Sequence, residues 1–244
     1  MSRLSRKNIN TSFFHIMSQG INREYIFEDN KNKQKYLSFL KEVQGEINIQ
    51  ILSYCMMDNH VHLLIFEKDF NKIINFMHKV NTKYALFYNK KSNRVGYVFR
   101  DRYKVQPIYS QRHLILCIDY IHNNPVKAKK CNKMSDYKYS SYNYNIFNND
   151  GLINEKIRNL IYSKKKYITS DDDYVFMEDD EDKDEVLKDI FNRVLKEKSI
   201  SKTELINHRD ILKNLVAKLK NENGISYRKI EKITGISREV LRKL

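Results

Sequence analysis

The chain has 244 residues, 41% of them hydrophobic, which is enough for one packed domain and a smaller second unit. No apolar run approaches the roughly 18 residues that a membrane span needs, and the first residues are polar, so we expect a cytoplasmic protein without a membrane partner. The formal net charge of +15 instead favours a polyanion such as nucleic acid. Cys55, Cys117 and Cys131 form no CxxC pair, which disfavours a disulfide framework and a zinc knuckle.

Composition divides the chain into three regions. Residues 1–150 are basic and rich in aromatic residues, with 24 Lys and Arg against 12 Asp and Glu, a net charge of +12. Residues 151–187 combine a helix-prone basic segment with an acidic stretch at 170–187 that we interpret as a solvated linker. Residues 188–244 are helical by pattern and basic again. We therefore expect one α+β domain followed by a small all-α module.

Hydrophobic periodicity predicts seven elements in the first region. These are strands at 12–18, 49–56, 60–66 and 104–109 and helices at 30–46, 70–88 and 111–123. The first six follow the order β-α-β-β-α-β, which is typical of a ferredoxin-like antiparallel sheet with helices on one face. Pro125 lacks an N–H and disfavours helical backbone at the residue before it, so we expect the last helix to end near residue 123.

The predicted strand at 60–66 begins with His60-Val61-His62. Because side chains alternate along a strand, the two histidines project from the same face, close enough to share one metal ion. Imidazole suits several transition metals, whereas a Mg²⁺ or Mn²⁺ site also needs an oxygen ligand and a phosphate beside it. The alternative is a pair of partly exposed histidines that bond to backbone or solvent.

The last predicted helix carries Tyr120 and Asn124, which lie one above the other near its end. Leu114, Cys117, Ile118 and Ile121 form the apolar stripe and leave Tyr120 at its border. A free tyrosine has a pKa near 10, so a nucleophilic tyrosine needs a neighbouring cation or base. The alternative is a structural role, since Tyr120 is one of 17 tyrosines.

Basic and aromatic residues alternate just before and on the fourth predicted strand. Arg100, Arg102 and Lys104 are candidates for binding DNA phosphates, and the alternative is a solvated cationic strand edge. Of the interleaved aromatic residues, Tyr97 and Tyr103 are candidates for base stacking, and we favour core packing for Phe99.

Five blocks in this region resemble the single-tyrosine HUH transposases, in particular the REP-associated tyrosine transposase branch of the insertion-sequence transposase-like family. They are FHIMSQGINR (14–23), MDNHVHLL (57–64), GYVFRDRYK (96–104), YIHNNPVKA (120–128) and YKYSSY (137–142). The blocks stand in the family's order. In three places the chain departs from the family pattern: Asp58 replaces a usual proline, Arg100 a common glutamine and Tyr139 a common tryptophan.

The resemblance implies an HUH fold of ferredoxin-like type, with His60 and His62 as metal ligands, Tyr120 as nucleophile and Asn124 as a further ligand. It also implies a Mg²⁺ or Mn²⁺ cofactor and hairpin-bearing single-stranded DNA as substrate. The implied activity is strand transfer through a 5′-phosphotyrosine intermediate with a free 3′-OH. Two other hypotheses stay open: a non-catalytic DNA- or RNA-binding regulator, and a metal-dependent hydrolase that uses water as the nucleophile. The sequence fits a monomer and a homodimer equally.

The last 35 residues predict helices at 210–220, 227–233 and 238–244. Thr234-Gly235-Ile236 is a tight turn between the last two, and the arrangement resembles a helix-turn-helix. Arg238, Arg242 and Lys243 would lie on the reading helix. We therefore expect this module to bind duplex DNA, and the alternative is a generic helical bundle or a dimerisation tail.

Overall fold

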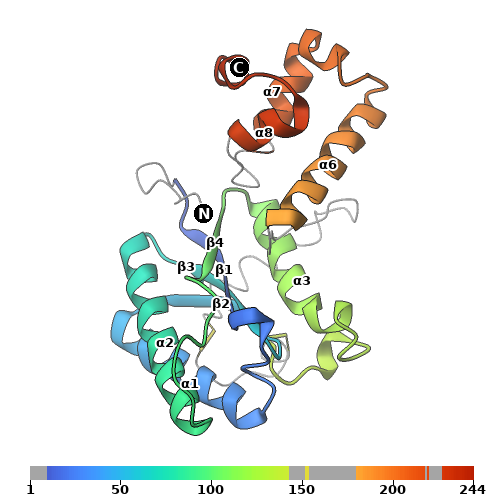
Figure 1. The fold of residues 1–244 in the computed structure, drawn as a ribbon. Helices are drawn as coiled ribbons and strands as arrows, with labels where there is room; N and C mark the ends of the chain where they lie inside the picture. The colour runs from blue at the N-terminus through green and yellow to red at the C-terminus, as the bar shows by residue number, and fades with distance from the viewer. Residues whose placement is uncertain (1–9, 143–151, 154–179, 218, 220–226) are drawn as a thin grey trace. The chain divides into compact units, whose positions relative to one another are not determined.

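The computed structural model describes residues 10–142, 152–153, 180–217, 219 and 227–244 (Figure 1). The chain divides into two compact units, residues 1–174 and residues 175–244, and each is described by itself. Within the described ranges, no helix is long and apolar enough to cross a membrane.

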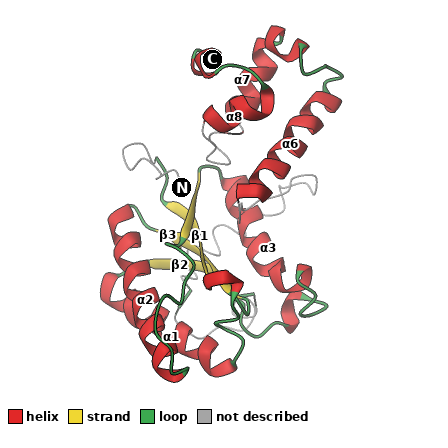
Figure 2. Ribbon diagram, in the orientation of Figure 1, coloured by secondary structure: helices red, strands yellow, loops and turns green. Residues whose placement is uncertain are grey.

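Four antiparallel strands form the sheet of the first unit (Figure 2). They are β1 (Phe13–Gln19), β2 (Gln50–Met56), β3 (His60–Phe66) and β4 (Lys104–Ile108), in the spatial order β2-β3-β1-β4. A 3-10 turn, η2 (Ile21–Arg23), follows β1, α1 (Asn30–Ile47) connects to β2, and α2 (Phe70–Lys91) connects β3 to β4. This is the predicted ferredoxin-like arrangement, and it places β1 and β3 side by side at the centre.

Helices α1 and α2 pack together on one face of the sheet and enclose an apolar core. Asp29 and Asp69 cap the two helices by accepting hydrogen bonds from the backbone N–H groups of Lys31 and Asn71. The core contains alternate residues of the central strands together with the inward stripe of each helix. These residues include Phe14, Ile16, Val61, Leu63, Ile65, Tyr36, Leu40, Val43, Ile73, Phe76, Met77, Val80 and Tyr84.

A third helix, α3 (Gln111–Lys127), packs on the opposite face, where it contacts β2 and β3. The prediction that helices cover only one face is therefore wrong. The strands show why: β2 and β3 are buried along nearly their whole length, which happens only when both faces are covered. The predicted stripe of α3 is confirmed, since Leu114, Cys117, Ile118 and Ile121 are all buried.

Helix α3 also runs past Pro125, four residues beyond its predicted end. Pro125 is buried, and its carbonyl accepts a hydrogen bond from the N–H of Lys130 at 2.8 Å. The N–H of Lys129 donates to the carbonyl of Val126 at 2.9 Å, and Lys129 has the left-handed φ of 54°. These bonds form a Schellman motif, which offsets the one helical hydrogen bond that proline removes.

Two short segments extend the sheet at its edges. Residues 98–100 pair with the end of β1, where the N–H of Ile21 donates to Val98 and that of Arg100 donates to Gln19. After a 3-10 turn, η3 (Met134–Asp136), residues 139–141 pair with β2 through Met56 and Tyr54. The chain that leaves α3 is thus fixed along the outer edge of β2.

The second unit is a small helical bundle. It contains α6 (Asp180–Glu197), the 3-10 turn η5 (Glu204–Asn207), α7 (Arg209–Ala217), α8 (Tyr227–Thr234) and α9 (Arg238–Arg242). Its core includes Phe191, Leu205, Leu212, Leu215, Ile230, Ile233 and Leu241. Helix α6 begins inside the stretch predicted as an acidic linker, so that part of the prediction is wrong: its acidic residues from Asp180 onward are helical. The predicted end of the helix at 210–220 lies outside the described residues.

Candidate active site

Three histidines from two neighbouring strands meet on the face of the sheet that α3 covers. The ring centroids of His60 and His62 lie 4.8 Å apart, so the two side chains share a face, as strand alternation predicts. Strand β1 pairs with β3 and adds His15, which is fully buried. A hydrogen bond of 3.0 Å joins His15 Nε2 to His62 Nδ1.

Helix α3 brings Tyr120 to these histidines. Its ring centroid lies 5.7 Å from that of His62 and 5.8 Å from that of His15. Between His62 and Tyr120 the chain passes through all of α2, all of β4 and the first turns of α3, and the packing of α3 across β2 and β3 brings the two residues together.

Helix α3 is anchored to the sheet beside Tyr120 by a buried polar cluster. His122 Nε2 lies 3.0 Å from the hydroxyl of Ser53 on β2 and 2.8 Å from that of Ser141 on the adjoining edge segment. The N–H of Tyr54 donates to the same Ser141 hydroxyl at 2.9 Å. These hydrogen bonds fix the rotation of α3, because polar groups buried there need these partners. This orientation of α3 about its axis directs the Tyr120 side chain toward His15 and His62.

The environment of His60 determines which of its nitrogens is available. Its Nδ1 donates a hydrogen bond of 2.6 Å to Asn59 Oδ1, so in the neutral ring Nε2 carries the lone pair. Among the described residues, His60 Nε2 is buried and has no hydrogen-bond partner. Burial lowers the pKa of His60 to about 4, against the opposing effect of the Asp58 carboxylate. His60 is therefore neutral at physiological pH.

The other two histidines are neutral for the same reason. Burial lowers the pKa of His15 well below its usual 6.5. For His62, burial acts first, and repulsion from His60 and His15 lowers the pKa further. The site therefore holds three uncharged imidazoles, the protonation state that metal coordination requires.

Two further residues lie near Tyr120. Asn124 is half-buried, and its Nδ2 donates a hydrogen bond of 2.9 Å to the Tyr120 carbonyl, a bond in which its Oδ1 takes no part. Lys127 was not singled out by sequence reasoning, yet its Nζ lies 5.2 Å from the centroid of the Tyr120 ring. His15 was also missed, although a histidine inside an apolar strand was a usable signal.

Within the described ranges, no cluster of three or more His, Cys, Asp or Glu side chains could hold a metal ion. A metal at this site would therefore bind two imidazoles and take its remaining ligands from an amide, water or phosphate oxygens. That donor set suits Mn²⁺ better than Mg²⁺, which prefers an all-oxygen shell.

Comparison with known proteins identifies the fold and the family. Residues 8–124 match the profile of the family described as "Transposase IS200 like". The match identifies residues 8–124 as a domain of this family. The structure of a REP-associated tyrosine transposase bound to a REP hairpin aligns with a TM-score of 0.51 and 17% identity, covering 63% of this chain and 89% of that one. At that identity it confirms the α+β fold alone.

A second solved structure, a putative transposase from Deinococcus radiodurans R1, covers 50% of this chain and 97% of its own, at 16% identity and a TM-score of 0.36. No curated protein sequence matches the chain.

The basic residues of the chain that the sequence singled out fall into two groups. In the first unit, Arg100 pairs through its backbone with Gln19, and Gln19 pairs with His60, so Arg100 stands in the row of the sheet that contains His60. Arg102 is exposed, and Lys104 is half-buried on β4. Phe99 packs against the core, as predicted, whereas Tyr97 is 83% exposed.

The second group lies on α9 of the second unit. Arg238 forms an ion pair of 2.7 Å with Glu231, Arg242 lies over the Tyr227 ring and Lys243 is exposed. The turn before α9 has the predicted form, with Gly235 at the left-handed φ of 73°. The Thr234 hydroxyl closes that turn by donating to Ile230 and accepting from the N–H of Ile236.

Proposed function

We propose that the first unit cleaves and rejoins hairpin-bearing single-stranded DNA, with Tyr120 as the nucleophile and His60 and His62 as ligands of a divalent metal. The observation that carries the proposal is the approach of Tyr120 to His62, with ring centroids 5.7 Å apart. Membership of the transposase family supports a DNA-cleaving activity. A regulator that only binds DNA needs no such convergence of a tyrosine with buried neutral histidines.

The proposed reaction exchanges one phosphodiester for another. The Tyr120 oxygen bonds to the phosphorus, the bond from phosphorus to the 3′ oxygen breaks, the phenol loses its proton and the 3′ oxygen gains one. The products are a 5′-phosphotyrosine and a free 3′-OH, so the step is reversible without ATP. Lys127 beside the Tyr120 ring would stabilise the negative charge that develops on the phenolic oxygen.

The residues present fit a divalent cation. Coordination through Nε2 of His60 agrees with the hydrogen bond from its Nδ1 to Asn59, and the Nδ1 of His62 is likewise engaged by His15. Asn124 Oδ1 is the proposed third protein ligand. When bound, Mn²⁺ or Mg²⁺ would polarise the scissile phosphate and neutralise its charge.

We assign the proposed DNA contacts to basic residues in both units. Arg100, Arg102 and Lys104 would bind phosphates of the single-stranded substrate close to the histidines. Hairpins are proposed because the solved relative is bound to a REP hairpin. Arg238, Arg242 and Lys243 of the second unit would bind duplex DNA in the manner of a helix-turn-helix.

The test is covalent capture. A 5′-labelled and a 3′-labelled single-stranded hairpin would be incubated with the full chain and Mn²⁺ and resolved on denaturing gels. We expect a protein–DNA adduct that Tyr120→Phe abolishes, a loss of at least about a thousandfold in rate. The control variant Tyr25→Phe, altered at a tyrosine that is 61% exposed, should retain the adduct.

Two results would refute the proposal. Cleavage that survives Tyr120→Phe would show that water is the nucleophile and that the chain is a hydrolase. Binding without cleavage across a panel of hairpins would show that the chain is a regulator.

A further inference from the structure

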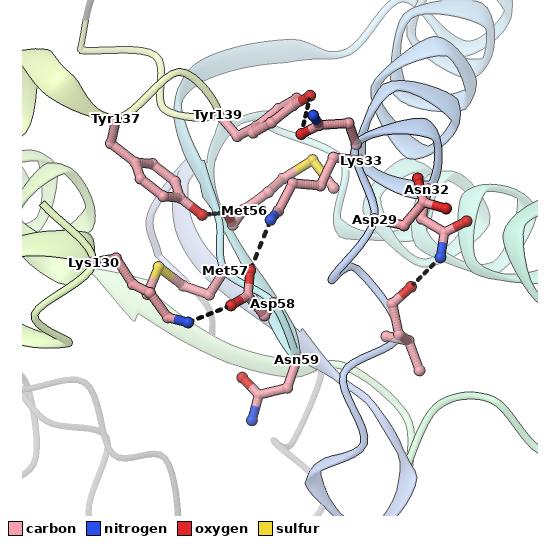
Figure 3. A network of polar contacts seen from close by, with 12 residues as sticks. Asp29, Asn32, Lys33, Met56, Met57, Asp58, Asn59, Lys130, Tyr137 and Tyr139 are labelled. Carbon is pink, nitrogen blue, oxygen red and sulfur yellow. Dashed lines mark hydrogen bonds and ion pairs between the residues drawn. The ribbon is translucent and has the colours of Figure 1, made fainter.

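Asp58, the residue that replaces the family's usual proline, bonds to two lysines from different parts of the first unit (Figure 3). Its Oδ1 lies 2.7 Å from Lys33 Nζ on α1, and its Oδ2 lies 2.6 Å from Lys130 Nζ, just after α3. Asp58 itself is in the turn between β2 and β3, two residues before His60. One carboxylate thus joins α1, the end of α3 and the turn that begins the histidine strand.

Backbone hydrogen bonds hold the turn that contains Asp58 in place. The Asp58 carbonyl accepts a hydrogen bond from the N–H of Phe27 at 2.7 Å, and the Asn59 carbonyl accepts one from Gly20 at 2.8 Å. The N–H of Met57 donates to the His60 carbonyl and closes the turn. Because three backbone bonds fix the turn, the carboxylate has little freedom to follow its lysine partners.

The Lys33 contact is the buried half of the network. The Lys33 side chain is only 7% exposed, against 49% for Lys130. A buried ammonium needs a nearby anion, and Asp58 is the anion that pairs with Lys33 of α1. Each Asp58 oxygen thus faces one ammonium group, Oδ1 that of Lys33 and Oδ2 that of Lys130.

The Lys130 contact reaches Tyr120 through a rigid connection. The Schellman motif ties the Lys130 backbone to Pro125, and Lys129 adopts a left-handed φ to make it. A non-glycine residue in that conformation is strained, so the surrounding contacts must hold it in place. Lys130 therefore moves with the last turns of α3, the helix that carries Tyr120 and Asn124.

We propose that Asp58 and Lys130 are positioning residues: their ion pair ties the end of the Tyr120 helix to the turn that begins the His60 strand. The pair sets the gap between the tyrosine and the histidines, although neither residue touches the reacting atoms. This inference rests on the proposed function. It gives Asp58 a role that proline cannot fill, because proline has no charge to hold the helix.

The test compares two neighbouring lysines in the full chain. Lys130→Met removes the pair, and Lys129→Met removes the same charge one residue away, where Lys129 pairs with neither Asp58 oxygen. Two measurements are made on each variant: the single-turnover rate of hairpin cleavage at saturating DNA, and hydrogen exchange of the amides from residue 117 to residue 130.

We expect Lys130→Met to slow cleavage about fivefold and to speed exchange at the end of α3, with the melting temperature unchanged. Lys129→Met should stay within about twofold of the unaltered chain on both measurements, and Lys130→Arg should restore both. Raising the salt concentration should shrink the difference between the unaltered chain and Lys130→Met, because salt screens a half-exposed pair.

Equal behaviour of Lys130→Met and Lys129→Met in both measurements would overturn the inference. Failure of the unaltered chain to cleave any hairpin would instead refute the proposed function. Hydrogen exchange would still decide, in that case, whether Lys130 holds the helix end.

Discussion

The two faces of the central sheet are built on different principles. The face under α1 and α2 buries aromatic and aliphatic side chains, and a polar atom among them, the Tyr84 hydroxyl, donates to the Ile26 carbonyl at 2.5 Å. The face under α3 buries His15, His62, Ser53 and His122 among apolar residues. One sheet thus carries a packing face and a face of paired polar groups.

This difference separates stability from chemistry. A buried hydrogen bond adds little net free energy, because the same groups bond to water in the unfolded chain, so four paired polar groups stabilise the fold less than apolar side chains of similar size would. On the α3 face, the rings of His15 and His62 lie beside that of Tyr120, and the hydrogen bond between Ser53 and His122 holds the helix that carries it. We infer that the α1 and α2 face holds the sheet together while the α3 face positions reactive groups.

The largest expected effect concerns the packing face. Phe76 is fully buried on α2, and Phe76→Ala should lower the free energy of unfolding by about 3–5 kcal/mol. Leu86→Ala, on the same helix but 69% exposed, should change it by less than about 0.5 kcal/mol. Denaturant unfolding followed by tyrosine fluorescence measures this unit well, because all tyrosines except Tyr227 precede residue 175. Similar losses in the two variants would contradict the assignment of this face.

Metal binding should affect only the other face. With Mn²⁺ at about a hundred times its dissociation constant, the unfolding free energy should rise by about 2.7 kcal/mol. His62→Gln should lose most of this increment, and Phe76→Ala should keep it despite its lower starting stability. For each variant the measured quantity is the free energy of unfolding with Mn²⁺ minus that without it. A change in the stability of the metal-free variant therefore cancels in the difference. An undiminished increment in His62→Gln would place the metal elsewhere.

Sequence patterns predicted the packing face well. The strand from His60 to Phe66 and the starts of α1 and α2 have their predicted bounds. Such elements are encoded locally, by alternation, by a helical stripe and by an aspartate cap just before each helix. The same local rules placed His60 and His62 on one face and Tyr120 one turn before Asn124.

The α3 face was harder to predict, because its contacts join residues far apart in the chain. Local reasoning ended α3 near residue 123, before Pro125, since nothing local reveals that Pro125 is buried or that Lys129 closes a Schellman motif. It also did not predict which face of the sheet α3 covers, and so it missed the contact between His15 and Tyr120. Asp58 was noticed only as a departure from a family pattern, and its lysine partners come from two distant elements.

The smallest expected effect tests whether the α3 face carries neutral histidines. Burial keeps the pKa of His15 well below 6.5 in the folded chain, whereas a histidine in the unfolded chain takes up a proton near pH 6.5. As the pH falls below 6.5, the unfolded state binds the extra proton and the folded state loses stability.

His15→Leu removes that proton, so between pH 7 and pH 6 in metal-free buffer it should lose less stability than the unaltered chain, by under about 1 kcal/mol. Phe76→Ala should keep the pH slope of the unaltered chain while lying below it at every pH, because it alters packing and no titrating group. Parallel slopes for His15→Leu and the unaltered chain would mean that His15 is charged when folded. A charged His15 would donate from both nitrogens, and His62 would then have to accept through Nδ1 and carry its proton on Nε2, the nitrogen that the proposed metal needs.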